Sequence, residues 1–334
     1  MKFINILVVV ALMTGGLHLH AQDFGVEYTT ELQTNFQGCN FVNLLRLNAE
    51  IPISKSMTVE ASTISIAKTR NERLLDDLQT FSNIEEDNLP LAIAVCGANW
   101  QINNKHSLFM GIRNMNEDYF TSPVTSFFTN SSCGIFPTIS ANYPIANYPV
   151  ASLGLHYCYD GSPIRVQASL YNGTGYNRFT GRENVFRLCP KNDGVFGIAE
   201  VSYNSGGSYY CIGNALHCNE RLSATPWFYT EQHICNTLSL LVGYSHAFAA
   251  TGECKDFVGI GAHYQQKKCE LGMFTDYACF VNAKEFATEI TLKYNATDNL
   301  YVQPIFHLIS TSFEASTCIV SVHTIGSLRI GVSF

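Results

Sequence analysis

Charge is scarce in this sequence, and the basic residues that exist are scattered. Only 14% of the 334 residues are charged, and the formal net charge is −7 at pH 7. Without a cluster of lysine and arginine there is nothing to neutralise a phosphate backbone, which excludes nucleic acid as an expected partner. The hydrophobic fraction of 46% is too high for a disordered chain. We therefore expect one folded domain.

Long apolar runs are absent after the N-terminus. Residues 1–21 have the features of a signal peptide, with a basic Lys2, an apolar run over 6–13 and small residues up to Ala21. That run is shorter than the roughly 20 apolar residues that a membrane-spanning helix needs. We therefore predict an exported protein whose mature domain covers 22–334 and which has no helical anchor.

Metal-binding and thiol motifs are also missing. The twelve cysteines include no Cys-x-x-Cys pair, and His217 beside Cys218 has no second pair to complete a ligand set. Cys96, Cys158 and Cys279 fall within strand-like runs, where a thiol can serve as a small apolar side chain. We expect no metal and no cofactor, and leave open whether any cysteines pair.

Strict alternation of apolar and polar residues is what the sequence does contain. In LRLNAEIPI, residues 45–53, every second residue is apolar and the intervening ones are mostly polar. The same pattern returns over 163–171 and 286–294. A period of two is typical of a β-strand with one apolar face.

Repeating this assignment along the chain gives about sixteen strands, an even number that is typical of bacterial outer-membrane barrels. They are expected at 24–37, 40–53, 57–68, 91–102, 106–115, 150–158, 163–172, 194–203, 208–217, 227–234, 238–248, 256–265, 269–279, 285–294, 299–310 and 321–334. Short connections alternate with mostly longer ones, which favours an antiparallel up-and-down transmembrane β-barrel over a soluble Greek-key sandwich. The last strand ends on Phe334, an aromatic terminus that resembles the signal read by the barrel assembly machinery.

The longest connection, 116–149, is the third on the long-loop side. All but the last residue of FFTNSSCGIFPTISANYPIANYPV (127–150) lies in it, and this stretch is rich in aromatic residues and proline and has little charge. A barrel of about sixteen strands is wide enough for an aqueous channel. We therefore predict that this loop folds into the lumen and narrows the pore.

At these residues the sequence resembles the OprB-type carbohydrate-selective porins of Gram-negative outer membranes. The matching pattern consists of Phe128, Asn130, Ser131, Ser132, Gly134, Pro137, Pro149, Val150, Leu153 and Gly154. Further similarity runs through GIRNMNEDY, VFGIAEVSY and ATEITLKYNATDNLYVQPIFHLI. The resemblance implies passive diffusion of mono- or small oligosaccharides, whose ring faces suit aromatic surfaces and whose hydroxyls suit polar side chains. Binding has to stay weak for conduction.

Candidate constriction residues follow from alternation and from the resemblance. Arg113 lies opposite the expected lipid-side residues Leu108, Met110 and Ile112 and leads into the long loop. The inward phase of other strands holds Arg46, Glu50, Arg165, Glu289, Lys293 and Arg329. The candidate set is Arg113, Asn116, Glu117, Asp118, Tyr119, Phe127, Phe128, Asn130, Phe136, Tyr148 and Arg165. The alternative for each is structural, because a lumen arginine can tie a loop to the wall and loop aromatics can pack on one another.

Other functions remain as alternatives. A general size-selective porin for small polar solutes is the first. An outer-membrane enzyme would need a nucleophile with a base, and no serine–histidine or acidic pair recurs at a suitable spacing, so no catalytic residue is assigned. A channel for apolar compounds or an adhesin fits the polar inward positions and the few long loops less well. The expected partners are membrane lipid, permeating sugars, the assembly machinery and possible homotrimer subunits.

Overall fold

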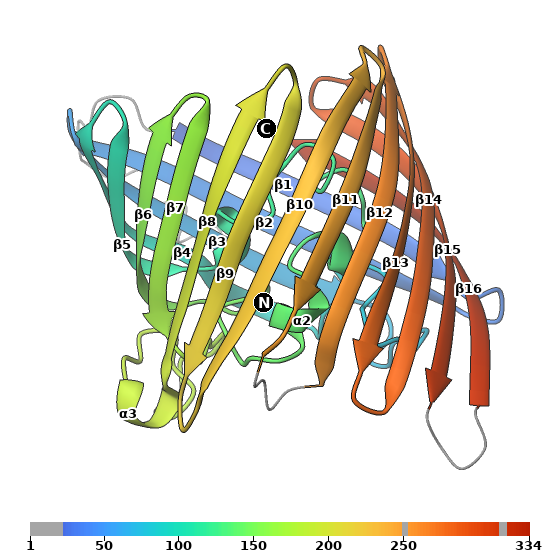
Figure 1. Cartoon of the computed structure of the whole chain (residues 1–334), viewed down its shortest axis with the longest axis horizontal. Helices are drawn as coiled ribbons and strands as arrows, with labels where there is room; N and C mark the ends of the chain where they lie inside the picture. The colour runs from blue at the N-terminus through green and yellow to red at the C-terminus, as the bar shows by residue number, and fades with distance from the viewer. Residues whose placement is uncertain (1–22, 249–252, 314–318) are drawn as a thin grey trace, which may run out of the picture.

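The computed structural model describes residues 23–248, 253–313 and 319–334, and its strands form one closed barrel (Figure 1). Each strand pairs antiparallel with its sequence neighbours, and the first closes the barrel by pairing with the last, from Glu27 opposite Ser333 to Thr34 opposite Gly326. The predicted all-β, antiparallel, sixteen-strand architecture is confirmed. The predicted signal peptide, 1–21, lies outside the described residues.

The strands are β1 (Asp23–Thr34), β2 (Cys39–Ser54), β3 (Met57–Lys68), β4 (Leu89–Asn103), β5 (His106–Arg113), β6 (Ser152–Gly161), β7 (Ile164–Asn172), β8 (Val195–Ser205), β9 (Ser208–Cys218), β10 (Leu222–Cys235), β11 (Leu238–His246), β12 (Cys254–Gln266), β13 (Cys269–Phe280), β14 (Ala283–Thr297), β15 (Leu300–Phe313) and β16 (Ile319–Ser333). Short helical turns occur at Met115–Glu117, Ser131–Cys133, α2 (Pro137–Ser140) and α3 (Pro190–Asp193). Within the described ranges no helix is both long and apolar enough to span a membrane.

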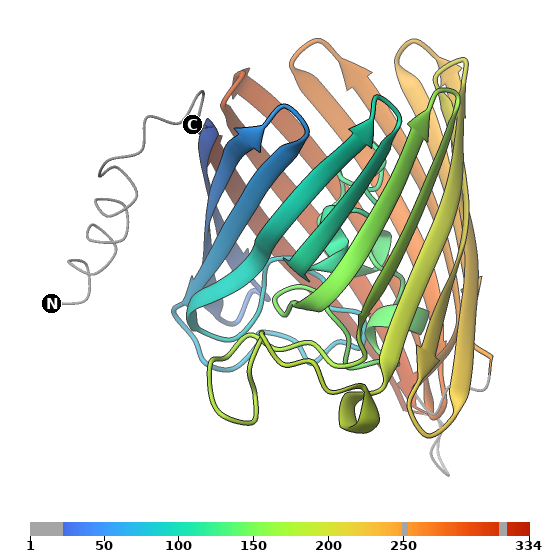
Figure 2. The same ribbon diagram turned by 90° about the vertical axis from the view of Figure 1, so that its left-hand side faces the viewer.

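Short turns and long loops lie at opposite ends of the barrel, as Figure 2 shows. Three loops are long: L2 (69–88), L3 (114–151) and L4 (173–194). The predicted loop at 218–226 is shorter than expected, because β10 already begins at Leu222, which pairs with Cys218. The eleven cysteines in the described ranges are free thiols.

The two faces of the wall differ as alternation predicts. Outward side chains such as Met110 (64% exposed) and Ile212 (65% exposed) are apolar, whereas inward Glu289 and Arg329 are buried beneath the loops. An apolar exterior around a polar interior is the pattern of a transmembrane barrel. One expectation was wrong: Ile112 does not face lipid, because Val185 of L4 packs over it.

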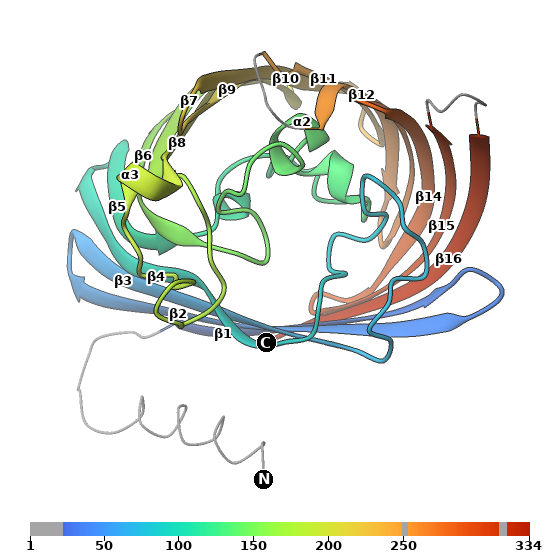
Figure 3. The same ribbon diagram turned by 90° about the horizontal axis from the view of Figure 1, so that it is seen from below.

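L3 folds into the barrel, as predicted, and Figure 3 shows it lying inside the ring of strands. All its aromatic residues except Tyr148 belong to one buried cluster with inward residues of β7–β14. The ring centroid of Phe120, for example, lies 4.8 Å from that of Phe136, also in L3, and 5.3 Å from that of Trp227 on β10. L3 therefore fills one side of the lumen as a packed core and leaves the other side open.

Candidate functional site

Carboxylates on the inner wall hold L3 by its backbone. Glu231 on β10 accepts N–H groups of Val124 at 2.9 Å and Thr125 at 3.3 Å, and also accepts the hydroxyl of Ser122. Buried N–H groups need acceptors, and a carboxylate can take several at once. The strand residue therefore fixes the turn of the loop that follows Tyr119.

A second anchor holds the Asn-Ser-Ser segment. Glu289 on β14 accepts the N–H groups of Thr129 at 3.0 Å and Asn130 at 2.7 Å. Asp276 on β13 accepts the Asn130 side-chain amide at 3.0 Å and the Ser132 hydroxyl at 2.6 Å. The motif that carried the family resemblance is thus an anchoring segment, and the candidate residue Asn130 serves in it.

L2 is also tied inside the barrel, although only L3 was predicted there. Glu285 on β14 accepts the N–H groups of Leu78 and Gln79, both at 2.9 Å. The Gln79 side chain donates to Asp276 at 2.9 Å. Figure 3 shows L2 reaching into the ring beside β14 and β15. Two loops, rather than one, therefore narrow the lumen.

Arg329 on β16 fastens the second half of L2. Its guanidinium donates to Glu31 on β1 at 2.6 Å and to L2 at Asn83 (2.9 Å) and Ser82 (3.3 Å). Because both Arg329 and Glu31 are buried, the pair neutralises charge that would otherwise be costly to bury.

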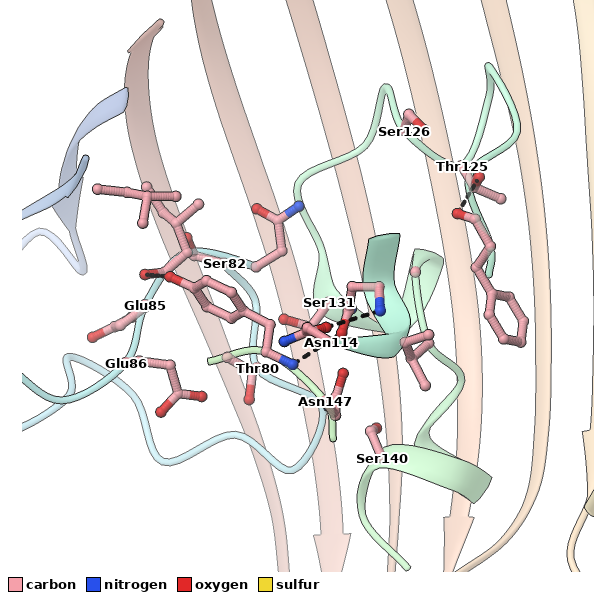
Figure 4. Close-up of a pocket in the computed structure, with 18 of the residues that line it drawn as sticks. Thr80, Ser82, Glu85, Glu86, Asn114, Thr125, Ser126, Ser131, Ser140 and Asn147 are labelled. Carbon is pink, nitrogen blue, oxygen red and sulfur yellow. Dashed lines mark hydrogen bonds between the residues drawn. The ribbon is translucent and has the colours of Figure 1, made fainter. Parts of the chain in front are cut away.

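The space left between the loops and the wall is a cavity of about 710 Å³. The walls of β1–β4 close one side, and L2 and L3 close the others. Figure 4 shows Ser82, Glu85 and Glu86 of L2 on one side, with Asn114 and Asn147 of L3 nearby. Its polar lining residues include Glu27, Thr29, Arg46, Thr80, Ser82, Asn83, Glu85, Glu86, Asn114, Asn116, Glu117, Thr121, Thr125, Ser126, Ser131, Ser140 and Asn147.

A chain of polar side chains crosses this cavity from the wall to L3. Arg46 on β2 bridges Glu117 of L3 at 2.6 Å and donates to Asn48 at 2.9 Å. Asn48 in turn donates to Glu27 on β1 at 2.8 Å. Both members of the Arg46–Glu117 pair remain partly exposed, at 27% and 18%. Both side chains therefore keep surface that faces the cavity.

Acidic groups predominate among the charged residues of the lining. Glu27, Glu85, Glu86 and Glu117 face only one arginine, Arg46. Burial raises the pKa of Glu85 and of Glu86 above the ordinary value. As the pH falls, these two carboxyl groups therefore lose their negative charge earlier than ordinary glutamates would.

Four of the eleven predicted site residues line the cavity: Asn116, Glu117, Phe128 and Tyr148. Asn116 accepts the backbone N–H of Tyr148 at 2.9 Å, and the Tyr148 hydroxyl donates to the Ile84 carbonyl of L2 at 3.3 Å. Tyr148 thus connects L3 to L2 at the edge of the cavity.

The two predicted arginines, Arg113 and Arg165, do not line the cavity and instead contact other protein groups. Arg113 forms a two-pronged pair with Asp118 at 2.7 and 2.8 Å and contacts Glu60 on β3 at 3.0 Å. Arg165 donates to the Cys158 sulfur at 3.4 Å. Neither arginine is among the residues lining the cavity. Arg113 and Asp118 instead fix the start of L3 to the wall.

The remaining predicted aromatics are buried against the wall. The Tyr119 hydroxyl shares a 2.8 Å hydrogen bond with Ser169. The ring centroid of Phe127 lies 4.4 Å from that of His263, and the ring centroid of Phe136 lies 4.6 Å from that of Phe257. These side chains form the packed side of the lumen. Arg46 and Glu27 are cavity residues that the candidate set omits, although alternation had placed Arg46 on the inward face.

Ser169, His156 and Asp118 come together in an order that resembles a hydrolase triad. His156 lies 2.8 Å from the Ser169 hydroxyl and 3.5 Å from Asp118. All three are buried beneath Tyr119, and Asp118 is already paired with Arg113. A nucleophile has to reach its substrate, and the 710 Å³ cavity does not extend to this serine.

Comparison with known proteins places the fold. No family model matches the chain, and no curated protein matches it in sequence. The high-pH structure of Pseudomonas putida OprB superposes with a TM-score of 0.79 at 15% identity, covering 94% of each chain. The low-pH structure of the same protein gives 0.63 at 14% identity, over 94% of this chain and 92% of that one. An anion-selective porin from Comamonas acidovorans gives 0.60 at 10% identity, over 94% and 99%. The predicted resemblance to OprB is confirmed at the level of the fold.

Proposed function

We propose that this protein is an outer-membrane porin through which carbohydrates diffuse passively. The observation that carries the proposal is the polar cavity between L2, L3 and the β1–β4 wall, inside a barrel with an apolar exterior. Such a passage offers water and polar groups to a solute along the axis of the barrel. The fold shared with OprB supports the same reading.

Sugar preference would come from the groups around the Arg46–Glu117 pair. Arg46, Glu117 and Asn116 supply charged and neutral hydrogen-bonding groups, and Tyr148 supplies a half-buried ring. Hydroxyl groups can pair with the former while a sugar face lies on the latter. The contacts are few, which suits weak binding and rapid release.

A general porin for small polar solutes is the second candidate. The observation that favours it is the burial of the other aromatics: Phe120 and Phe128 border the cavity, yet are only 4% and 2% exposed. With little aromatic surface available, solutes would be sorted by size and charge rather than by ring chemistry.

The proposal also includes the location of the protein in the outer membrane. The mature domain, 22–334, would enter a Gram-negative outer membrane after loss of residues 1–21. Phe334, whose side chain is 77% exposed, would be available to the assembly machinery. The proposal extends to a homotrimer, which the oligomeric state of the protein in mild detergent tests.

Liposome swelling tests the proposal. The purified mature chain is reconstituted and challenged with glucose, disaccharides, amino acids and uncharged polyols of matched size. Faster entry of sugars than of size-matched polyols supports a carbohydrate pore. Entry ordered by size alone favours the general porin, and no swelling with a correctly folded barrel contradicts both.

A further inference from the structure

The outer wall of the barrel has a groove that the lumen does not explain. It lies over β7–β11, the strands at the front of Figure 1, and encloses about 890 Å³. Its lining is formed chiefly by outward-facing residues, including Val201, Ile212 and Phe228. The groove therefore opens towards the membrane and not towards the pore.

A row of small side chains forms the floor. Ala168 on β7 pairs with Ala199 on β8, Ala199 with Asn214 on β9, and Asn214 with Pro226 on β10. The parallel row two residues away is large: Val201, Ile212, Phe228 and Tyr244 pair in the same succession. The contrast between the rows makes the depression. With strands ~4.8 Å apart, a row that crosses four strands extends for about 14 Å.

The loop-side end of the groove is polar. His246, the last residue of β11, lies 2.7 Å from Asp256 on β12, and the Tyr244 hydroxyl donates to the same carboxylate at 3.2 Å. The His246 ring meets Phe248 edge-on at 4.4 Å. An apolar trough thus ends beside a histidine–aspartate pair, near the rim where the strands give way to loops.

The shape and position indicate the occupant. An outward wall of a membrane barrel is covered by hydrocarbon, and a flat wall gives each chain one contact face. An occupant that lies on the small row touches both this floor and the flank of the large row beside it, and so gains dispersion contacts that a flat wall does not offer. We propose that this groove binds one acyl chain of a bilayer lipid, with the lipid headgroup beside His246 and Asp256. The inference depends on the barrel lying in a bilayer and is independent of which solute the pore conducts.

Filling the groove tests this. Ala199→Phe places a large side chain on the floor, and Ala168→Phe does the same on the adjacent strand. Ala98→Phe is the matched control, because Ala98 pairs with Met110 on the outer face of β4 and β5, away from the groove. Each protein is reconstituted in vesicles of phosphatidylethanolamine and phosphatidylglycerol, extracted in mild detergent and weighed by native mass spectrometry.

We expect one lipid retained on the wild type and on Ala98→Phe, and none on the two groove variants, with liposome swelling unchanged in all four. Equal lipid retention by control and groove variants would overturn the proposal, as would a wild type that retains no lipid. A wild-type oligomer that Ala199→Phe converts to monomers would instead identify a second copy as the occupant. Heat-modifiable migration on gels shows which variants fold. The number of lipids retained by the wild-type protein tests the proposal even if both groove variants misfold.

Discussion

The two sides of the lumen differ in how they use the same residue types. Along β10–β14, inward acids such as Glu231 and Glu289 accept hydrogen bonds from backbone N–H groups of L3. Aromatic rings fill the space between L3 and these strands. Along β1–β4, Arg46 and Glu27 border open space; Arg46 pairs with Glu117, which also borders it, and Asn48 links Arg46 to Glu27. The inward acids of the first side therefore support the fold of L3, whereas Arg46 on the second side keeps a partly exposed charge at the cavity.

Removing an anchor of L3 on the packed side of the lumen should have the largest effect on conductance. Glu289→Ala removes the acceptor of two buried N–H groups, each of which costs about 1–3 kcal/mol when unsatisfied. We expect L3 to leave the wall, single-channel conductance to rise and larger sugars to enter liposomes. Glu289→Gln keeps a carbonyl acceptor and should show a smaller change. Unaltered conductance in Glu289→Ala would show that L3 is held without this carboxylate.

Arg113 and Arg46, one on a buried ion pair and one on a partly exposed pair, should differ in their contribution to stability. Arg113→Ala strands the buried Asp118, a loss of about 3–5 kcal/mol for a broken buried pair. Arg46→Ala breaks a partly exposed pair worth about 0–1 kcal/mol. Thermal unfolding in detergent should therefore separate them, with Arg113→Ala strongly destabilised and Arg46→Ala close to wild type. Swelling rates should change in Arg46→Ala while its stability does not. Equal melting temperatures for the two variants would contradict this division.

Charge selectivity tests the open side alone. Because four glutamates face one arginine there, we expect the channel to prefer cations at neutral pH. Glu117→Gln should weaken this preference and Arg46→Ala should strengthen it. Reversal potentials across a salt gradient measure both changes. Glu72→Gln serves as the control, since Glu72 is exposed on L2 and does not line the cavity; an equal shift there would mean that the net charge of the whole protein sets selectivity.

The architecture was predictable because alternation is local, so LRLNAEIPI and its repeats could be assigned without knowing their partners. The inward fold of L3 followed from its length and its aromatic residues. The fold of L2 into the barrel could not be found this way, since Glu285 lies 206 residues from the Gln79 N–H that it accepts. The same limit applies to Arg113 and Arg46. Both are inward arginines, and only the positions of their partners Asp118 and Glu117 separate a structural tie from a residue that lines the cavity.

The smallest expected effect concerns L2 and pH. Asp77 accepts the N–H of Phe81 at 2.6 Å and faces Arg73 and Glu285. Burial raises its pKa from 3.8 to about 7. In the folded protein the carboxyl takes up a proton near pH 7, whereas in the unfolded chain it does so only near pH 4. Lowering the pH from about 7.5 towards 5 should therefore add a stabilising contribution from this group.

Thermal unfolding of wild type and Asp77→Asn at several pH values isolates that contribution, because the other acids are common to both proteins. We expect the difference between their melting temperatures to change with pH, the wild type gaining on the variant as the pH falls. Glu72→Gln, at an exposed L2 position, is the control and should follow the wild type. A pH-independent difference for Asp77→Asn would mean that Asp77 has an ordinary pKa and that L2 is held by Glu285 and Arg329 alone.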